Sequence, residues 1–200
     1  MLQLTGDQAD EAAIKKNAPG RRILHLATHA YSLSQRCGST PRTMELLGQS
    51  SIIGDGLLQR SGLAVAGANR RGDATSVAGA EDGILMAEEI ASLDLSGVEW
   101  AVLSACDTGV GRVLAGEGVV GLRRAFEVAG AGTLIMSLWA VDDGAARVWM
   151  RKLYEERLAG LSTAEAVGKA GLEIIEAQRG QGRTTHPYFW GSFVAAGDWR

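Results

Sequence analysis

Residues Trp100–Gly109 read WAVLSACDTG, and this stretch decides the fold. From Trp100 to Ala105 it is apolar apart from Ser104, and a short continuous apolar run is typical of a strand covered on both faces, as in the parallel sheet of an α/β protein. The run ends at Cys106 and breaks into a glycine-rich loop. A buried strand that delivers a thiol to the start of a loop indicates a nucleophile, so Cys106 is a candidate catalytic residue.

The composition bounds the class of protein. The chain has 200 residues, of which 46% are hydrophobic, so one domain can bury a core without disulfides or metals. Its 20 basic and 23 acidic residues are interspersed, so we expect no direct contact with nucleic acid or with a membrane. Cys37 and Cys106 lie in different settings and form no disulfide framework, which fits a reducing compartment. The N-terminal residues lack the pattern of a signal peptide. The sequence therefore predicts a cytoplasmic protein.

Helical and strand patterns alternate along the chain. The long segment between residues 32 and 61 is polar and is predicted to be a loop, and Asp7 is the expected N-cap of the first helix. The expected strands are Ile23–Thr28, Gly62–Ala66, Trp100–Ala105, Thr133–Trp139 and Tyr188–Ala196. The expected helices are Asp7–Lys16, Leu85–Ser92, Val119–Ala129 and Ser162–Gln178, and a further long helix is expected to follow the N-cap candidates Asp142 and Asp143 and to end at about Leu158. This alternation predicts an α/β fold with a mostly parallel sheet.

A second candidate follows the first predicted strand, which ends at His29. The carboxyl ends of parallel strands meet at one edge of the sheet, where active sites of open α/β proteins lie. If the two strands are neighbours, His29 and Cys106 can act together, because an adjacent imidazole raises the thiolate fraction of a cysteine. The alternative for each residue is structural: an inert thiol packed in the core and a histidine that serves packing.

Other chemistries fit less well. His25 and His29 are four residues apart, but they lie on a predicted strand and lack the glutamate of the zinc-protease helix motif, so no metal is expected and His25 is interpreted as a core histidine. A dinucleotide fingerprint after Gly109 and Gly111 would need glycine where Leu114 stands. Ser104 lies two residues before Cys106 but outside a nucleophile elbow. We therefore expect no cofactor.

Taken together, six segments resemble the CHAT domain, a caspase-like family of cysteine peptidases that often accompanies tetratricopeptide repeats. In chain order they are ILHLATHA, DGILMAEEI, VLSACDTG, GEGVVGLRRAFEVAGA, SLWAVDD and HPYFWGSF. The resemblance runs from about residue 5 to Gly197. It implies a caspase-like three-layer α/β/α fold with a mostly parallel sheet, and a dyad of His29 and Cys106.

The resemblance also implies further site residues. The family usually has glycine after its histidine, and its backbone N–H stabilises the oxyanion together with that of the cysteine; here Ala30 stands at that position. Alanine keeps the N–H donor but tolerates a positive φ poorly. Asp142 and Asp143 follow the fourth strand, near the caspase-like specificity wall, and are candidates for binding a basic substrate residue. Their alternative role is to cap the following helix.

The implied function is hydrolysis of peptide bonds in a protein or peptide substrate through a thioester on Cys106. The rival interpretation is a non-catalytic module of the same fold that binds a partner, and a third is a nucleotide binder. The family's repeat region and upstream part lie outside these 200 residues. We therefore expect residues 1–200 to form a single domain, either a fragment of a longer module or a minimal stand-alone form, with a regulatory partner or a repeat domain as a further possible contact.

Overall fold

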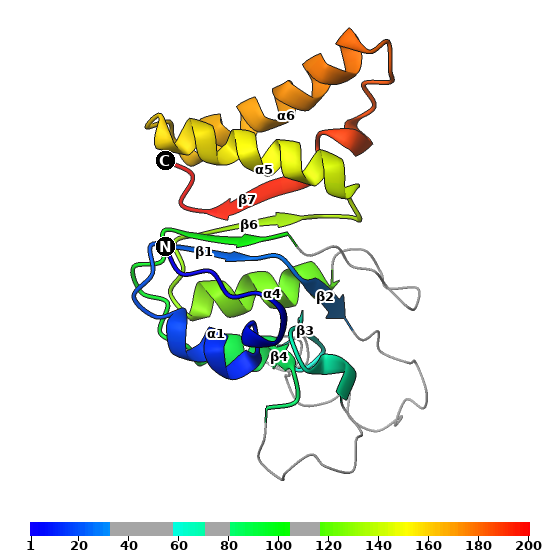
Figure 1. The fold of residues 1–200 in the computed structure, drawn as a ribbon. Coiled ribbons are helices and arrows are strands. Elements are labelled where there is room, and N and C mark those ends of the chain that lie inside the picture. The colour runs from blue at the N-terminus through cyan, green and yellow to red at the C-terminus, as the bar shows by residue number, and fades with distance from the viewer. Residues whose placement is uncertain (33–57, 71–80, 105–116) are drawn as a thin grey trace, which may run out of the picture.

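A four-stranded sheet forms the centre of the computed structural model, which describes residues 1–32, 58–70, 81–104 and 117–200. Its strands lie in the order β1-β5-β6-β7. The first three are parallel and β7 runs antiparallel to β6 (Figure 1). Their bounds are Ile23–Leu26 for β1, Trp100–Leu103 for β5, Thr133–Ser137 for β6 and Phe193–Gly197 for β7. The predicted central strand and its parallel neighbours are thus confirmed.

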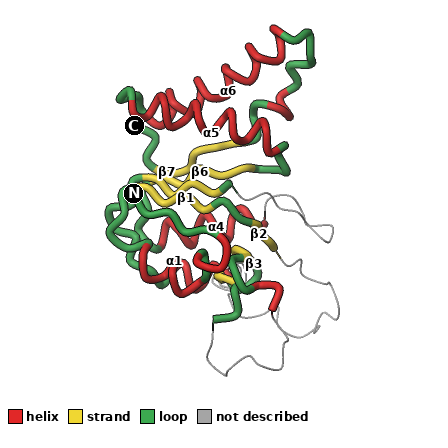
Figure 2. Tube along the Cα trace, in the orientation of Figure 1, coloured by secondary structure: helices red, strands yellow, loops and turns green. Residues whose placement is uncertain are grey.

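Helices cover both faces of this sheet and make three layers (Figures 1 and 2). Ala101 and Leu103 point to one layer, while Trp100 and Val102 point to the other, because side chains alternate along a strand. The first layer holds α1 (Glu11–Asn17), α3 (Ala87–Ala91) and α4 (Glu117–Val128), and the second holds α5 (Asp143–Leu158) and α6 (Thr163–Gly180). All four residues of β5 are buried, as the continuous apolar run predicts. The α/β/α fold class is confirmed.

A second, smaller sheet departs from the prediction. It contains β2 (His29–Ser32), β3 (Ser61–Ala64) and β4 (Ile84–Met86), all paired antiparallel. The predicted strand Gly62–Ala66 therefore pairs outside the main sheet, and the helix expected from Leu85 begins only at Ala87. A short apolar run fits a strand and a buried helix equally well, which is why the sequence predicts helix for the residues just before Ala87. Such a run also does not predict which strand it will pair with.

Side-chain caps define the helix ends. The prediction that Asp7 caps the first helix is wrong: residues Gly6–Gln8 form a 3-10 turn, and Asp10 accepts a hydrogen bond of 2.7 Å from the backbone N–H of Ala13. Asp142 caps α5, and Ser162 opens α6 with a capping box. Within the described residues, each helix is too short or too polar to span a bilayer.

The last strand also begins later than predicted. Residues Pro187–Phe189 form a 3-10 turn, and β7 starts at Phe193. The exposed rings of Tyr188 and Phe189 pack edge to face with their centroids 5.4 Å apart. The aromatic cluster therefore packs beside the last strand rather than extending it.

Candidate active site

His29 lies at the carboxyl edge of the main sheet, three residues beyond Leu26, the last residue of β1. Strands β1 and β5 are direct neighbours with Leu26 opposite Leu103, and the backbone N–H of Ser104 donates to the carbonyl of Leu26 over 3.1 Å. His29 is exposed. Cys106 lies outside the described residues. In the sequence, however, His29 lies three residues after Leu26, and Cys106 lies three residues after Leu103, its partner in the strand register.

After β1 the chain passes from the main sheet to the smaller one, and His29 is the first residue of β2 in that smaller sheet. His29 pairs with Ala64, and the hydroxyl of Thr28 donates to the carbonyl of the same residue. Ala30 pairs with Leu63, and its methyl group packs against the core beside α4. Alanine is thus accommodated in extended backbone here, a conformation that needs no glycine.

A cavity of about 430 Å³ opens beside the end of β5, between this sheet edge and α5. Ser104, two residues before Cys106, contributes to its wall. The other lining residues are His25, Asp143, Ala146, Arg147, Met150, Arg151 and Tyr154. Of the two predicted substrate-binding aspartates, Asp143 lines this cavity, whereas Asp142 accepts the capping hydrogen bond of 3.0 Å from the backbone N–H of Ala145.

His25 and Tyr154 form one wall of this cavity. Their rings stack with centroids 5.7 Å apart, and Tyr154 Oη lies 2.9 Å from His25 Nδ1. Burial raises the pKa of Tyr154 to about 12, and desolvation lowers the pKa of His25. At pH 7 the tyrosine hydroxyl therefore keeps its proton, and it shares a hydrogen bond with a neutral imidazole.

The prediction that His25 belongs to the core is wrong, since the residue is exposed as a whole while its ring rests on Tyr154. The reason is its strand: β1 is an edge strand of the main sheet, where the imidazole ring stacks on Tyr154 of α5 while the residue stays exposed. Sequence reasoning also missed Arg147 and Arg151. The two arginines are four residues apart in the helix that Asp142 caps, so they share one face of α5. This spacing could have pointed to them from the sequence.

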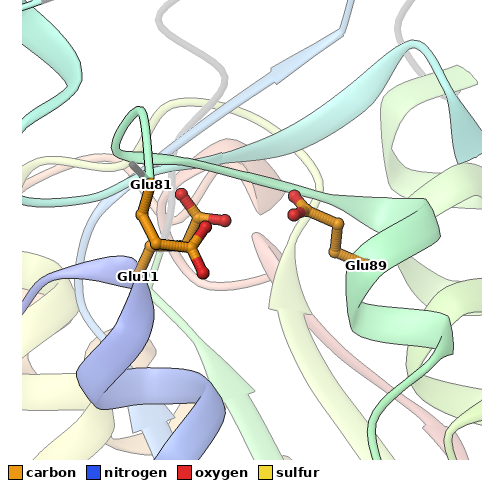
Figure 3. Close-up of side chains that lie close together, drawn as sticks. All are labelled: Glu11, Glu81 and Glu89. Carbon is orange, nitrogen blue, oxygen red and sulfur yellow. The ribbon is translucent and has the colours of Figure 1, made fainter. Parts of the chain in front are cut away.

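A separate group of charges joins α1 to α3 (Figure 3). The carboxylates of Glu11, Glu81 and Glu89 lie within 4.8 Å of one another. The ammonium of Lys15 already sits among them, 2.6 Å from Glu11, 3.0 Å from Glu81 and 2.8 Å from Glu89. Burial raises the pKa of Glu11 to about 7. Because the lysine ammonium occupies the position between the carboxylates that a metal ion would need, we interpret the group as a structural ion-pair network and not as a metal centre.

The three layers, the parallel strands and the strand-end histidine define a caspase-like α/β domain of the kind related to cysteine peptidases. The profile of the CHAT domain matches residues 3–198, and the chain belongs to the CHAT domain family. This confirms the family inferred from the six segments.

Two mammalian relatives are similar to the chain. Tetratricopeptide repeat protein 28 of Mus musculus is 28% identical over 201 residues, which cover 97% of this chain and 8% of that protein. The Homo sapiens protein of the same name is 31% identical over 114 residues, which cover 57% of this chain and 4% of that protein. The chain therefore spans less than a tenth of the length of either relative. Both names refer to tetratricopeptide repeats and to no reaction.

Proposed function

We propose that the chain is a cysteine endopeptidase in which Cys106 is the nucleophile and His29 its acid-base partner. One observation carries the proposal. β1 and β5 are adjacent parallel strands, and each leads to one of the two residues over the same number of positions beyond the register pair Leu26 and Leu103. The exposure of His29 at this edge leaves its ring accessible to a substrate.

The proposed reaction has two stages. In the first, the Cys106 thiolate attacks the scissile carbonyl carbon, the C–N bond breaks, and the His29 imidazolium gives its proton to the leaving amine. In the second, His29 takes a proton from water, the hydroxide attacks the thioester, and the C–S bond breaks to release the acid. The N–H groups of Ala30 and Cys106 are the proposed oxyanion donors. Asp143, which lines the cavity, and Asp142 remain proposed substrate contacts, and the substrate is a protein or peptide.

The test is labelling by a peptidyl acyloxymethyl ketone, which alkylates an activated thiol. We expect the probe to label Cys106 in the wild-type chain, with the modified residue located by mass spectrometry. Cys106→Ala should abolish labelling, and His29→Ala should slow it at least 100-fold, because removing a paired base removes thiolate activation. His186→Ala and Cys37→Ala are the matched controls and should label at the wild-type rate. Labelling of Cys106 at an equal rate in His29→Ala would refute the dyad.

Ala30 and the repeat-protein relatives favour a second function, that of a non-catalytic CHAT module which binds a partner. The same experiment separates the two functions. A binding module would show no labelling of Cys106 that depends on His29. A folded chain that fails to react in this way, with a cooperative unfolding transition as the control, would support the module. Cytoplasmic location and contact with a repeat domain are part of either proposal.

A further inference from the structure

We propose that the cavity beside β5 is a recognition site for an acidic side chain, aspartate or glutamate, of a peptide. We call it the arginine cavity; its walls are His25, Ser104, Asp143, Ala146, Arg147, Met150, Arg151 and Tyr154. The inference rests on the proposed function in one respect only, that the peptide is the substrate cleaved at Cys106.

The position of the cavity links it to the proposed nucleophile. Ser104 lines it and precedes Cys106 by two residues. Two residues of extended chain span at most about 7 Å. A substrate residue whose carbonyl meets Cys106 can therefore reach the cavity with a side chain of ordinary length. A cavity of about 430 Å³ has ample room for the side chain of aspartate or glutamate.

The charged residues of the arginine cavity favour an anionic ligand. Arg147 and Arg151 lie one helical turn apart on α5 and are exposed, so their guanidinium groups reach solvent at the mouth of the cavity. Among the described residues, Arg151 forms one ion pair, a long contact of 3.8 Å with Glu155, which leaves most of its donors to other partners. Among the described residues that line the cavity, Asp143 is the single acidic one, against two arginines. A carboxylate accepts hydrogen bonds only, and guanidinium groups bind it with charge-assisted bonds.

The remaining lining residues in the described part of the chain add no charge at pH 7. Tyr154 shares a hydrogen bond with His25, whose imidazole is neutral at pH 7. Met150 is almost fully buried and supplies an apolar part of the wall. A lysine or arginine side chain in this space would meet two guanidinium groups and one carboxylate, and the net repulsion disfavours it. The arrangement therefore favours an acidic residue over the basic residue that Asp142 and Asp143 suggested from the sequence.

The first experiment uses a set of peptidyl acyloxymethyl ketones that differ only in the residue next to the ketone: aspartate, glutamate, asparagine, leucine or arginine. We expect the aspartate or glutamate probe to label Cys106 at least tenfold faster than the asparagine probe. Arg147→Gln and Arg151→Gln should reduce that ratio to below threefold, while Arg179→Gln, an exposed arginine on α6, should leave it unchanged. Equal labelling by all probes, or fastest labelling by the arginine probe, would overturn the inference.

The second experiment does not depend on catalysis. Binding of fluorescein-labelled peptides to the Cys106→Ala chain is measured by anisotropy, with aspartate, asparagine or arginine at the varied position. The aspartate peptide should bind at least tenfold more tightly than the asparagine peptide, and Arg147→Gln should abolish the difference. If no probe labels Cys106 but this preference is found, the proposed peptidase fails and the acidic-peptide site stands. Equal affinity for the three peptides, or binding of inorganic phosphate without a preference among peptides, would overturn the site.

Discussion

Glu11→Gln is expected to remove a pH-dependent loss of stability. Glu11 is buried at 2% exposure, and burial raises its pKa from 4.5 to about 7. In that window the folded chain binds more protons than the unfolded chain, so the free energy of unfolding falls as the pH rises. The difference in pKa sets an upper limit of about 3 kcal/mol, since each tenfold change in proton affinity corresponds to about 1.4 kcal/mol.

The expected loss is smaller than this limit because part of the titration lies below pH 5, outside the range compared. The contact of 2.6 Å between Lys15 Nζ and Glu11 lowers the pKa of Glu11 against the larger effect of burial, so it is already contained in the pKa of about 7. We expect the wild-type chain to lose on the order of 2 kcal/mol between pH 5 and pH 8 through this residue. Lysine contacts and hydrogen bonds lower the pKa values of Glu81 and Glu89, so their contribution is present above about pH 4.5 and is lost only as the pH falls below it.

Urea unfolding followed by tryptophan fluorescence at several pH values between 5 and 8.5 measures this loss. Glutamine is neutral throughout, so Glu11→Gln should lose less stability than the wild type over this range. Glu88→Gln, on an exposed position of α3, is the matched control and should follow the wild-type curve. The effect of His25 has the opposite sign and is common to all three chains, so it cancels in the comparison. The reasoning is refuted if Glu11→Gln and the wild type lose the same free energy.

Further changes test the core and the second titrating group. Trp100→Phe removes the hydrogen bond of 3.0 Å from the buried indole to Thr163 and leaves a smaller ring in the core, so it should cost at least about 1–2 kcal/mol in urea unfolding; an unchanged free energy of unfolding would contradict this. Leu134→Ala empties a position that is 2% exposed and should cost about 3 kcal/mol, whereas a cost below 1 kcal/mol would show that β6 is not part of the core. Ser162→Ala breaks the capping box of α6 and should cost about 1 kcal/mol, seen as a lower midpoint of unfolding. Because desolvation lowers the pKa of His25, this residue opposes the stability that the chain gains through Glu11 as the pH falls from 7 to 5. His25→Gln should therefore gain more stability than the wild type over this range, and an equal gain would contradict this assignment.

The central strand and the helix starts were predictable because their signals are local. The continuous apolar run of Trp100–Leu103 requires cover on both faces, and the structure provides it. Asp142 and Ser162 cap their helices through hydrogen bonds to residues three positions away, which the spacing alone indicates. The prediction that Asp7 is the N-cap is wrong because Asp10 offers the same capping chemistry at the point where the helix begins.

The sequence by itself therefore determined the α/β class, the family and the two candidate catalytic residues, His29 and Cys106. Tertiary structure decided which strands pair, which face of β1 stays open, and what surrounds the strand ends. His25 and Tyr154 meet across 129 positions, and Ser104 shares a cavity with arginines from α5. Such contacts between distant segments depend on how one layer packs on another, and local sequence patterns do not predict that packing. The physical basis of the proposed specificity, two guanidinium groups at the edge of the site, thus comes from packing between distant segments.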